Sequence, residues 1–419
     1  MAKPKGVRER IESGADKSPA PSATHFTTGC TLLDLVVGGG RGKMGFKGGA
    51  LVNLVAIEAA GKTQLASESI AHNTHKTPGF WHQYIDREHR YSFDTQGLYG
   101  VSVCDPSEWV PDTIEELDGY LGNLLEAAKT PGMIVVDSLD AFSTEETEDR
   151  AAKRSKQVDE GKDIKQDGSY TVSTGTPKFL SESLRIRMTQ ASNTGTCLLF
   201  LSQVRAKLGA MAFDPNKYIR NGGKALDHWC NDVVWLKPLH KIKTGKSEDQ
   251  SERVQGVVVK AWTTKNSTDR PFRECLYTIL FDYGIDNIGS NIDYLFNLRD
   301  PKKGDLVVKD SDLIQWSVGK PKNLETVKAW LVSVEKLDAC VADCKAEKKT
   351  ISMSYLESWI ARDPEALDAF RKEFPSYTRD QLIKAVEDSE DMALELERRV
   401  LEKWERIEQE AASNRKRKF

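Results

Sequence analysis

Short apolar runs alternate with amphipathic stretches along most of the chain. Largely apolar runs at 50–55, 80–86, 133–136 and 196–205 are typical of strands buried on both faces. Between two of them, apolar residues recur at helical spacing over 113–129. Strands that alternate with helices predict an α/β fold, with a mostly parallel, twisted sheet flanked by helices.

The same pattern predicts where the sheet ends. Runs at 233–236, 254–264 and 273–281 have strand character and are expected to complete the sheet as antiparallel strands. From about residue 300 the spacing becomes helical, over 324–336, 355–361, 364–374 and 378–409. We therefore predict a core at 24–299 and a small α-rich C-terminal lobe at 300–419.

Both ends of the chain are polar. Residues 1–23 are rich in Lys, Pro, Ser and Ala, and we expect a flexible N-terminal arm. Two interpretations stay open for it, a disordered tail or an arm that docks on a neighbouring subunit. The tail at 415–418 is basic, and such tails are solvated or help to capture DNA.

One stretch within the core, 143–176, is polar and has little apolar periodicity. A loop this long in a compact domain is functional or disordered. A second stretch mixes Lys207, Lys217 and Arg220 with Tyr218, and cations beside an aromatic suit contact with phosphates and packing on bases. A solvated loop is the alternative interpretation.

The first candidate for chemistry is the segment Ala56-Ile57-Glu58-Ala59-Ala60-Gly61-Lys62-Thr63, followed by Gln64 in a predicted helix. Strand, loop, Gly-Lys-Thr and helix form the context of a phosphate-binding P-loop. Backbone amides and the helix N-terminus would hold the β-phosphate, Lys62 would reach the β- and γ-phosphates, and the Thr63 hydroxyl would bind Mg²⁺. Ala56 replaces the usual first glycine, and a chance Gly-Lys-Thr is the alternative.

Acidic residues follow two of the predicted parallel strands. Glu88 follows the run at 80–86, and Asp137 follows the run at 133–136. Because parallel strands end at one edge of a sheet, these side chains are expected beside the phosphates. Glu88 could then activate water, and Asp137 could hold Mg²⁺ opposite Thr63. Solvated strand ends are the alternative.

Several motifs in this order resemble the RecA recombinase family over roughly residues 25–290. The motifs are a Thr-Gly turn with a Leu-Asp helix, an Asp-x-Glu-His, a Val-Val-Asp-Ser, a Gly-Gly-x-Ala-Leu and a Lys-Asn…Pro-Phe, here at 27–34, 86–89, 135–138, 222–226 and 265–272. The long stretch at 143–176 and the variant P-loop resemble bacteriophage members more than bacterial ones.

The resemblance implies roles for individual residues. It implies that Glu88 is the catalytic base, that Gln203 senses the γ-phosphate, that Lys265 reaches a neighbouring subunit's nucleotide, and that Phe281 stacks on adenine. It places DNA-binding loops at 143–176 and 206–221. We predict the DNA contacts at Arg185, Arg205, Lys207, Lys217, Tyr218, Arg220, Gly222 and Gly223.

The function implied is that of an ATP- and Mg²⁺-dependent recombinase. Such a protein forms homo-oligomeric filaments on single-stranded DNA and pairs it with double-stranded DNA. A single-strand-binding or mediator protein is a further candidate partner. Asp227 and His228 stand where the bacterial family has Lys and Phe, and Ser267 replaces a lysine. These departures keep open a DNA-binding ATPase without strand exchange, such as a mediator or annealing accessory; a hexameric helicase is a more distant alternative.

Composition limits these interpretations. The chain has 419 residues, 29% of them charged, and a net charge of −3, so a DNA site must be a local patch. Seven scattered cysteines suit a reducing compartment, and neither a signal peptide nor a membrane-spanning stretch is predicted. We expect a cytoplasmic protein, in the host cytoplasm if a phage encodes it.

Overall fold

The computed structural model describes residues 24–40, 42–57, 59–159, 175–206, 218–220, 223–243, 252–316 and 323–412. The N-terminal arm and the basic tail predicted from the sequence lie outside these residues. Two compact units form: the first is Met1–Asn291, Asp300–Asp305 and Val400–Phe419, and the second is Ile292–Arg299 and Leu306–Arg399.

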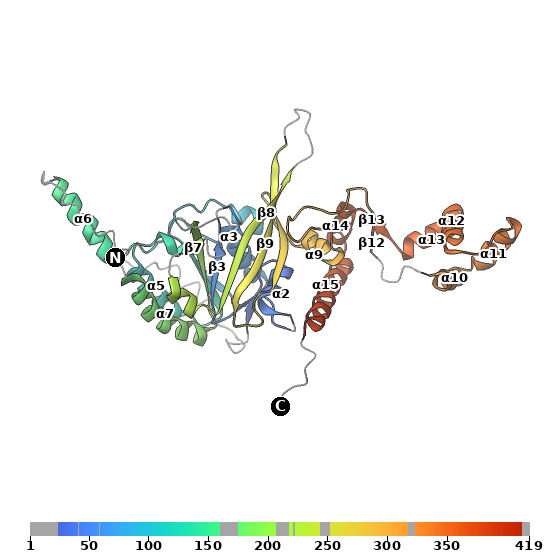
Figure 1. The fold of residues 1–419 in the computed structure, drawn as a ribbon. Coiled ribbons are helices and arrows are strands. Elements are labelled where there is room, and N and C mark those ends of the chain that lie inside the picture. The colour runs from blue at the N-terminus through green and yellow to red at the C-terminus, as the bar shows by residue number, and fades with distance from the viewer. Residues whose placement is uncertain are drawn as a thin grey trace. The chain divides into compact units, whose positions relative to one another are not determined.

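The first unit contains the predicted sheet (Figure 1). Its strand order is β11-β10-β9-β8-β3-β6-β5-β4. Neighbours from β8 to β4 are parallel, and β8 to β11 are antiparallel, as the sequence predicts for its two groups of strands. The bounds are β3 Leu51–Ala56, β4 Trp81–Asp86, β5 Gly132–Asp137, β6 Cys197–Ala206, β8 Asp232–Lys243, β9 Val254–Asn266, β10 Glu274–Leu280 and β11 Gly284–Asp286.

Helices cover both faces of this sheet. They are α2 Thr31–Gly38, α3 Lys62–Lys76, α4 Thr95–Tyr99, α5 Ile114–Ala127, α7 Gly175–Thr194 and α8 Gly223–Trp229. On one face, Leu51 and Phe200 of the strands pack with Leu117 and Leu121 of α5 and Leu184 of α7. Helix α3 also contacts β3, β5 and β6, but none of its residues belongs to that cluster. Since successive strand residues point to opposite sides of a sheet, α3 packs on the other face.

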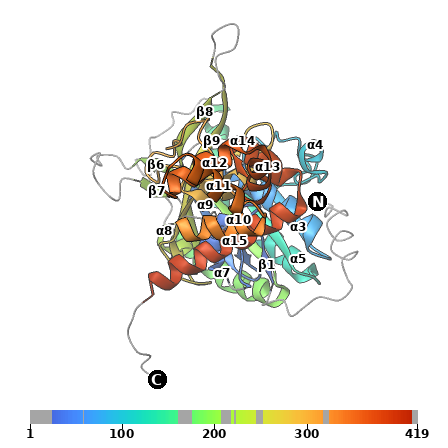
Figure 2. The ribbon, with the colours of Figure 1, turned by 90° about the vertical axis from the view of Figure 1, so that its right-hand side faces the viewer.

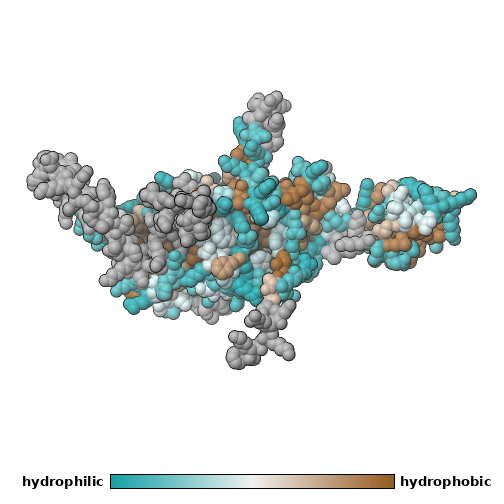
Figure 3. All heavy atoms as spheres, viewed as in Figure 1, coloured by the Kyte–Doolittle hydropathy of each residue, from teal (hydrophilic) through white to brown (hydrophobic). Residues whose placement is uncertain are grey.

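The β8–β9 hairpin extends beyond the part of the sheet that β3 reaches. Strand β3 pairs with β8 only over Asp232 to Leu236, whereas β8 continues to Lys243. The hairpin projects in two views at right angles (Figures 1 and 2), and its described surface is mainly hydrophilic (Figure 3). A solvated surface explains why the continuous apolar run of β8 ends at Leu236, after which none of its residues is buried.

The prediction of a loop over 143–176 is wrong for nearly half of that stretch. Residues Glu145–Asp159 form helix α6, and α7 begins at Gly175. Helix α6 has no apolar face to reveal it, but three acidic residues in its first turn favour a helix N-terminus. In the second stretch, β7 Tyr218–Arg220 pairs antiparallel with β6.

The second unit is α-rich, as predicted. Four of its helices, between residues 324 and 373, pack around Trp330, Leu331, Leu356 and Trp359. The predicted helical run at 378–409 is two helices, because Thr378 caps the first and Ser389 Oγ accepts from the backbone amide of Met392 at the start of the second. The helices are α10 Leu324–Ser333, α11 Leu337–Ala346, α12 Met353–Arg362, α13 Pro364–Glu373, α14 Arg379–Glu387 and α15 Glu390–Glu410.

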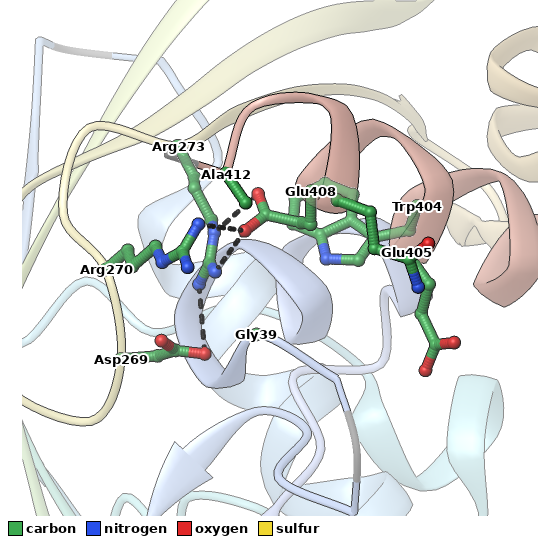
Figure 4. Close-up of a pocket in the computed structure, with 9 residues that line it drawn as sticks. Gly39, Asp269, Arg270, Arg273, Trp404, Glu405, Glu408 and Ala412 are labelled. Carbon is green, nitrogen blue, oxygen red and sulfur yellow. Dashed lines mark hydrogen bonds and ion pairs between the residues drawn. The ribbon is translucent and has the colours of Figure 1, made fainter. Parts of the chain in front are cut away.

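The end of α15 groups with the first unit, which differs from the predicted division at 299/300. Trp404 and Glu408 of α15 lie against Arg273, which precedes β10 (Figure 4). The Arg273 guanidinium donates to both Glu408 carboxylate oxygens, at 3.0 and 2.7 Å. These contacts join residues 135 positions apart, which no periodicity in the sequence could indicate.

In the described part of the chain, no helix is both long enough and apolar enough to cross a membrane.

Candidate nucleotide-binding site

The turn between β3 and α3 has the geometry of a phosphate-binding loop. Ala59 and Gly61 have positive φ angles of 57° and 79°. A Cβ at Gly61 would lie 2.3 Å from Ile279 Cδ1 on β10, so this position requires glycine for its conformation and for space. Turns of this kind direct backbone amides toward an anion. Lys62 begins α3 and is 9% exposed.

The other P-loop residues are placed as follows. Ala56, which replaces the usual glycine, is the last residue of β3 and pairs with Gln203 on β6 and Leu236 on β8. It therefore belongs to the sheet, where a Cβ is accommodated. Ala60 is buried, and the Gln64 side chain donates to the Tyr99 hydroxyl. Glu58 lies outside the described residues.

Thr63 and Asp137, the two predicted Mg²⁺ ligands, are in contact. Thr63 Oγ1 donates to Asp137 Oδ2 at 2.9 Å, and the Tyr84 hydroxyl donates to the same oxygen at 2.6 Å. Asp137 is 8% exposed. Burial raises the pKa of Asp137, the two hydrogen bonds oppose this shift, and the nearby charges of Glu88 and Asp86 add to it. A bound cation would favour the ionised carboxylate.

Glu88 and Gln203 also meet at the ends of their strands. Glu88 Oε1 accepts from Gln203 Nε2 at 2.8 Å and from Ser138 Oγ at 2.5 Å. The backbone amide of Gln203 donates to Asp140 Oδ2 at 2.7 Å. The carboxylate that the sequence predicts as the base is thus oriented by two neutral donors from two other strand ends. Our sequence analysis missed Ser138 and Tyr84 as site residues, although Ser138 directly follows Asp137.

Lys265, which the sequence analysis assigns to a neighbouring subunit's nucleotide, contacts its own chain in this structure. Its Nζ donates to the backbone carbonyls of Asp227 and His228, at 2.8 and 2.9 Å, at the end of α8. Carbonyls in the last turn of a helix are stabilised by donors from outside the helix, so Lys265 stabilises this helix end within its own chain. Phe281 follows β10 and is 62% exposed, two residues beyond Ile279, which lies beside Gly61.

The predicted DNA-binding residues are only partly described. Arg185 is exposed on α7, whereas its neighbour Arg187 pairs with Asp118 at 2.7 Å. Arg205 lies on β6, Tyr218 and Arg220 lie on β7, and Gly223 begins α8. Lys207, Lys217 and Gly222 lie outside the described residues.

Comparisons with known proteins identify relatives of this chain. The family described as RecA N-terminal domain matches residues 11–286. Protein RecA of Chlamydia trachomatis serovar A is 28% identical over 333 residues, which cover 79% of this chain and 85% of that protein. Protein RecA of a Sulfurovum species is 28% identical over 290 residues, 69% of this chain and 74% of that protein.

Among solved structures, one titled as the crystal structure of the RadB recombinase covers 62% of this chain and 98% of its own. Its sequence identity is 18% and its TM-score is 0.40. The family match alone covers well over half of the chain. This chain therefore belongs to the RecA family, whose members are ATP-dependent recombinases and DNA-dependent ATPases.

Proposed function

We propose that this RecA-family ATPase forms helical filaments on single-stranded DNA and promotes homologous pairing and strand exchange. The observation that carries the proposal is the arrangement at one edge of the sheet. Glu88, held by Ser138 and Gln203, lies at the strand end next to Asp137, which contacts Thr63. The residues that we propose as base, γ-phosphate sensor and Mg²⁺ ligands thus lie along the same edge of three parallel strands, which supports the proposal.

The residues present fit Mg²⁺ with ATP. Thr63 and Asp137 offer oxygen ligands, and among the described residues no group of three His, Cys, Asp or Glu could hold a metal. Mg²⁺ accepts such a sparse set, because phosphates and water supply its other ligands. When bound, it would neutralise charge on the phosphate oxygens. Lys62 and the amides of the P-loop would bind the same phosphates.

Glu88 would orient water for attack on the γ-phosphate and accept its proton. Gln203 contacts Glu88 through its side chain, and its strand leads directly into the segment at 206–221. Movement of Gln203 on hydrolysis would therefore reach that segment. We assign Phe281 to adenine and Lys265 to a neighbouring subunit's nucleotide. For the latter, Lys265 would have to release the carbonyls of α8.

We assign DNA contact to the segments at 143–176 and 206–221, with Arg185 exposed nearby on α7. A test is the charge-removal variant of Lys207, Lys217 and Arg220. Affinity for single-stranded DNA should fall for all sequences alike, and the log–log salt slope should flatten by about 0.7 for each phosphate that is no longer neutralised. Tyr218→Ala should cost roughly 1–3 kcal/mol with little change in slope. An unchanged slope in the triple variant would remove the second segment from the DNA site.

A second candidate function, a DNA-binding ATPase without strand exchange, is favoured by one observation. Lys265 is engaged within its own chain, and Ser267 and Asp227 replace family residues near it. A mediator or single-strand-binding protein would then be a working partner. The long segment at 143–176 and the P-loop that begins at Ala56 support a bacteriophage member of the family.

One experiment separates these functions. The full chain is imaged by electron microscopy with single-stranded DNA and a slowly hydrolysed ATP analogue, and strand exchange is measured in parallel. Helical filaments with strand exchange support the proposal, and DNA binding without exchange supports the second candidate. Closed rings would point to a hexameric motor and contradict both.

A further inference from the structure

We propose that Tyr84 is a positioning residue for Asp137 and sets the affinity of the site for Mg²⁺. This inference rests on the proposed function, because it concerns the same metal. Tyr84 lies on β4, is 3% exposed, and donates its hydroxyl to Asp137 Oδ2 at 2.6 Å. In the register of β4 with β5, Tyr84 pairs with Val135, and Val135 shares a face of the sheet with Asp137.

The Tyr84 side chain is part of a closed network of contacts. Its ring packs edge-on against Tyr91, with ring centroids 4.8 Å apart. The Tyr91 hydroxyl lies 2.8 Å from Ser67 Oγ, and Ser67 Oγ donates to the Thr63 carbonyl at 2.8 Å. Since Ser67 uses its only proton there, Tyr91 is the donor to Ser67. Thr63 then closes the network by donating to Asp137.

This network connects the P-loop helix α3 to β4, to the segment after β4 and to β5. The backbone amide of Tyr91 donates to Asp86 Oδ2 at 2.8 Å, which also fixes the segment to the end of β4. A rotation of the Asp137 carboxylate would therefore break its hydrogen bonds with Thr63 and Tyr84. The network thus holds both predicted metal ligands in a single arrangement.

The two carboxylate oxygens of Asp137 have different roles, and this difference links Tyr84 to Mg²⁺ binding. Both described hydrogen bonds to the Asp137 carboxylate go to Oδ2, and among the described residues none goes to Oδ1. Oδ1 is thus left for a cation or for its bound water. A phenol is protonated at neutral pH and a carboxylate can only accept, so the Tyr84 hydroxyl is the donor in this bond.

Without the Tyr84 hydroxyl, Asp137 would be held by Thr63 alone. The Thr63 hydroxyl is itself a predicted Mg²⁺ ligand, so it would have to hold the cation and orient the carboxylate together. Partners that orient a ligand in this way change metal affinity by about 10–100-fold when they are removed. Tyr84→Phe removes only the hydroxyl and keeps the ring that packs on Tyr91.

The test measures binding of a fluorescent ADP analogue to the full chain while Mg²⁺ is titrated. We expect Tyr84→Phe to need about 10-fold more Mg²⁺ for half-saturation, with unchanged nucleotide affinity in EDTA. Tyr277→Phe is the matched control, since Tyr277 is buried on β10 and its hydroxyl has no hydrogen-bond partner among the described residues. The control should keep the wild-type Mg²⁺ requirement.

An unchanged Mg²⁺ requirement in folded Tyr84→Phe would overturn the inference. So would an equal loss of nucleotide affinity with and without Mg²⁺, which indicates a merely structural hydroxyl. If this variant does not fold, Ser67→Ala breaks the network at another point. A higher Mg²⁺ requirement in Ser67→Ala would then support the inference, and an unchanged requirement would overturn it. Wild-type protein that binds no nucleotide in Mg²⁺ would instead overturn the proposed function.

Discussion

Two regions of the first unit hold carboxylates in opposite ways. At the nucleotide site, Asp137 and Glu88 accept hydrogen bonds from neutral donors, namely Thr63, Tyr84, Ser138 and Gln203. The exposed Arg90 guanidinium lies 3.8 Å from the other Glu88 oxygen, too far for a hydrogen bond. Where α15 meets the core, Glu408 is held by the Arg273 guanidinium, with Arg270 Nη1 at 3.5 Å from the same carboxylate. The chemistry available to the two regions differs accordingly.

A neutral donor orients a carboxylate and leaves its negative charge in place. Asp137 and Glu88 can therefore still attract a cation or accept a proton. An arginine pair neutralises the carboxylate that it holds, and its geometry is fixed by two parallel hydrogen bonds. Near Arg273, a pocket of about 120 Å³ is lined by residues of both charges, including Asp269, Arg270 and Glu405. We interpret this second region as structural.

We expect the largest effect from Lys62→Ala, because this change removes the Lys62 ammonium group from the nucleotide site. We expect ATP hydrolysis and active filament formation to be abolished, since the charge of the transferring phosphoryl group is no longer stabilised. Lys76→Ala, at the exposed end of the same helix, is the control and should hydrolyse ATP normally. Wild-type ATPase in Lys62→Ala would contradict the P-loop interpretation.

Glu88→Gln tests the first half of the comparison. An amide can still accept from Ser138 and Gln203, so the geometry is kept while the base is lost. Hydrolysis should slow by about 10²–10⁴-fold with ATP binding retained. Turnover and nucleotide affinity, measured separately, check this. If binding falls as much as turnover, Glu88 is a structural residue like Glu408.

Glu408→Gln tests the second half. Arg273, whose side chain is 8% exposed, would lose its charged partner on α15 and keep only Asp269 at 3.4 Å. We expect the first unit to lose about 2 kcal/mol of unfolding free energy in denaturant, with little change in ATPase. Glu410→Gln, exposed at the end of the same helix, should change neither quantity. A large loss of ATPase without a loss of stability would give this region a functional role.

The sequence predicted the first region far better than the second. Asp137 ends β5, Glu88 follows β4 and Gln203 lies near the end of β6, and apolar runs reveal such ends directly. Tyr84 could not be predicted as a site residue, because an aromatic within a strand is expected in the core until the register shows what its hydroxyl meets. The contact of Glu408 with Arg273 depends on how a distant helix returns to the core, which local patterns do not encode.

Glu68 is a further carboxylate held by neutral groups, and because it is buried it sharpens the comparison. It lies on α3, is 4% exposed, and accepts from the backbone amide of Ile285 at 2.9 Å. Tyr99 also donates to it at 3.3 Å, and His72, whose pKa burial lowers, lies 3.9 Å away. Because these donors carry no charge, the Glu68 carboxyl can still gain or lose a proton as the pH changes.

Burial raises the pKa of Glu68 from 4.5 to about 7, against the opposing hydrogen bonds from Ile285 and others. The folded state therefore keeps a proton that the unfolded state releases above about pH 4.5. The stabilising contribution is complete below that pH and is lost as the pH rises through about 7, at up to about 1.4 kcal/mol per pH unit. Glu68→Gln should remove this dependence, because its amide oxygen can accept from Ile285 at any pH. Chemical denaturation at pH 5 and pH 8 measures the difference: wild type should lose more stability between the two than Glu68→Gln, and parallel losses would mean that Glu68 stays ionised in the folded protein.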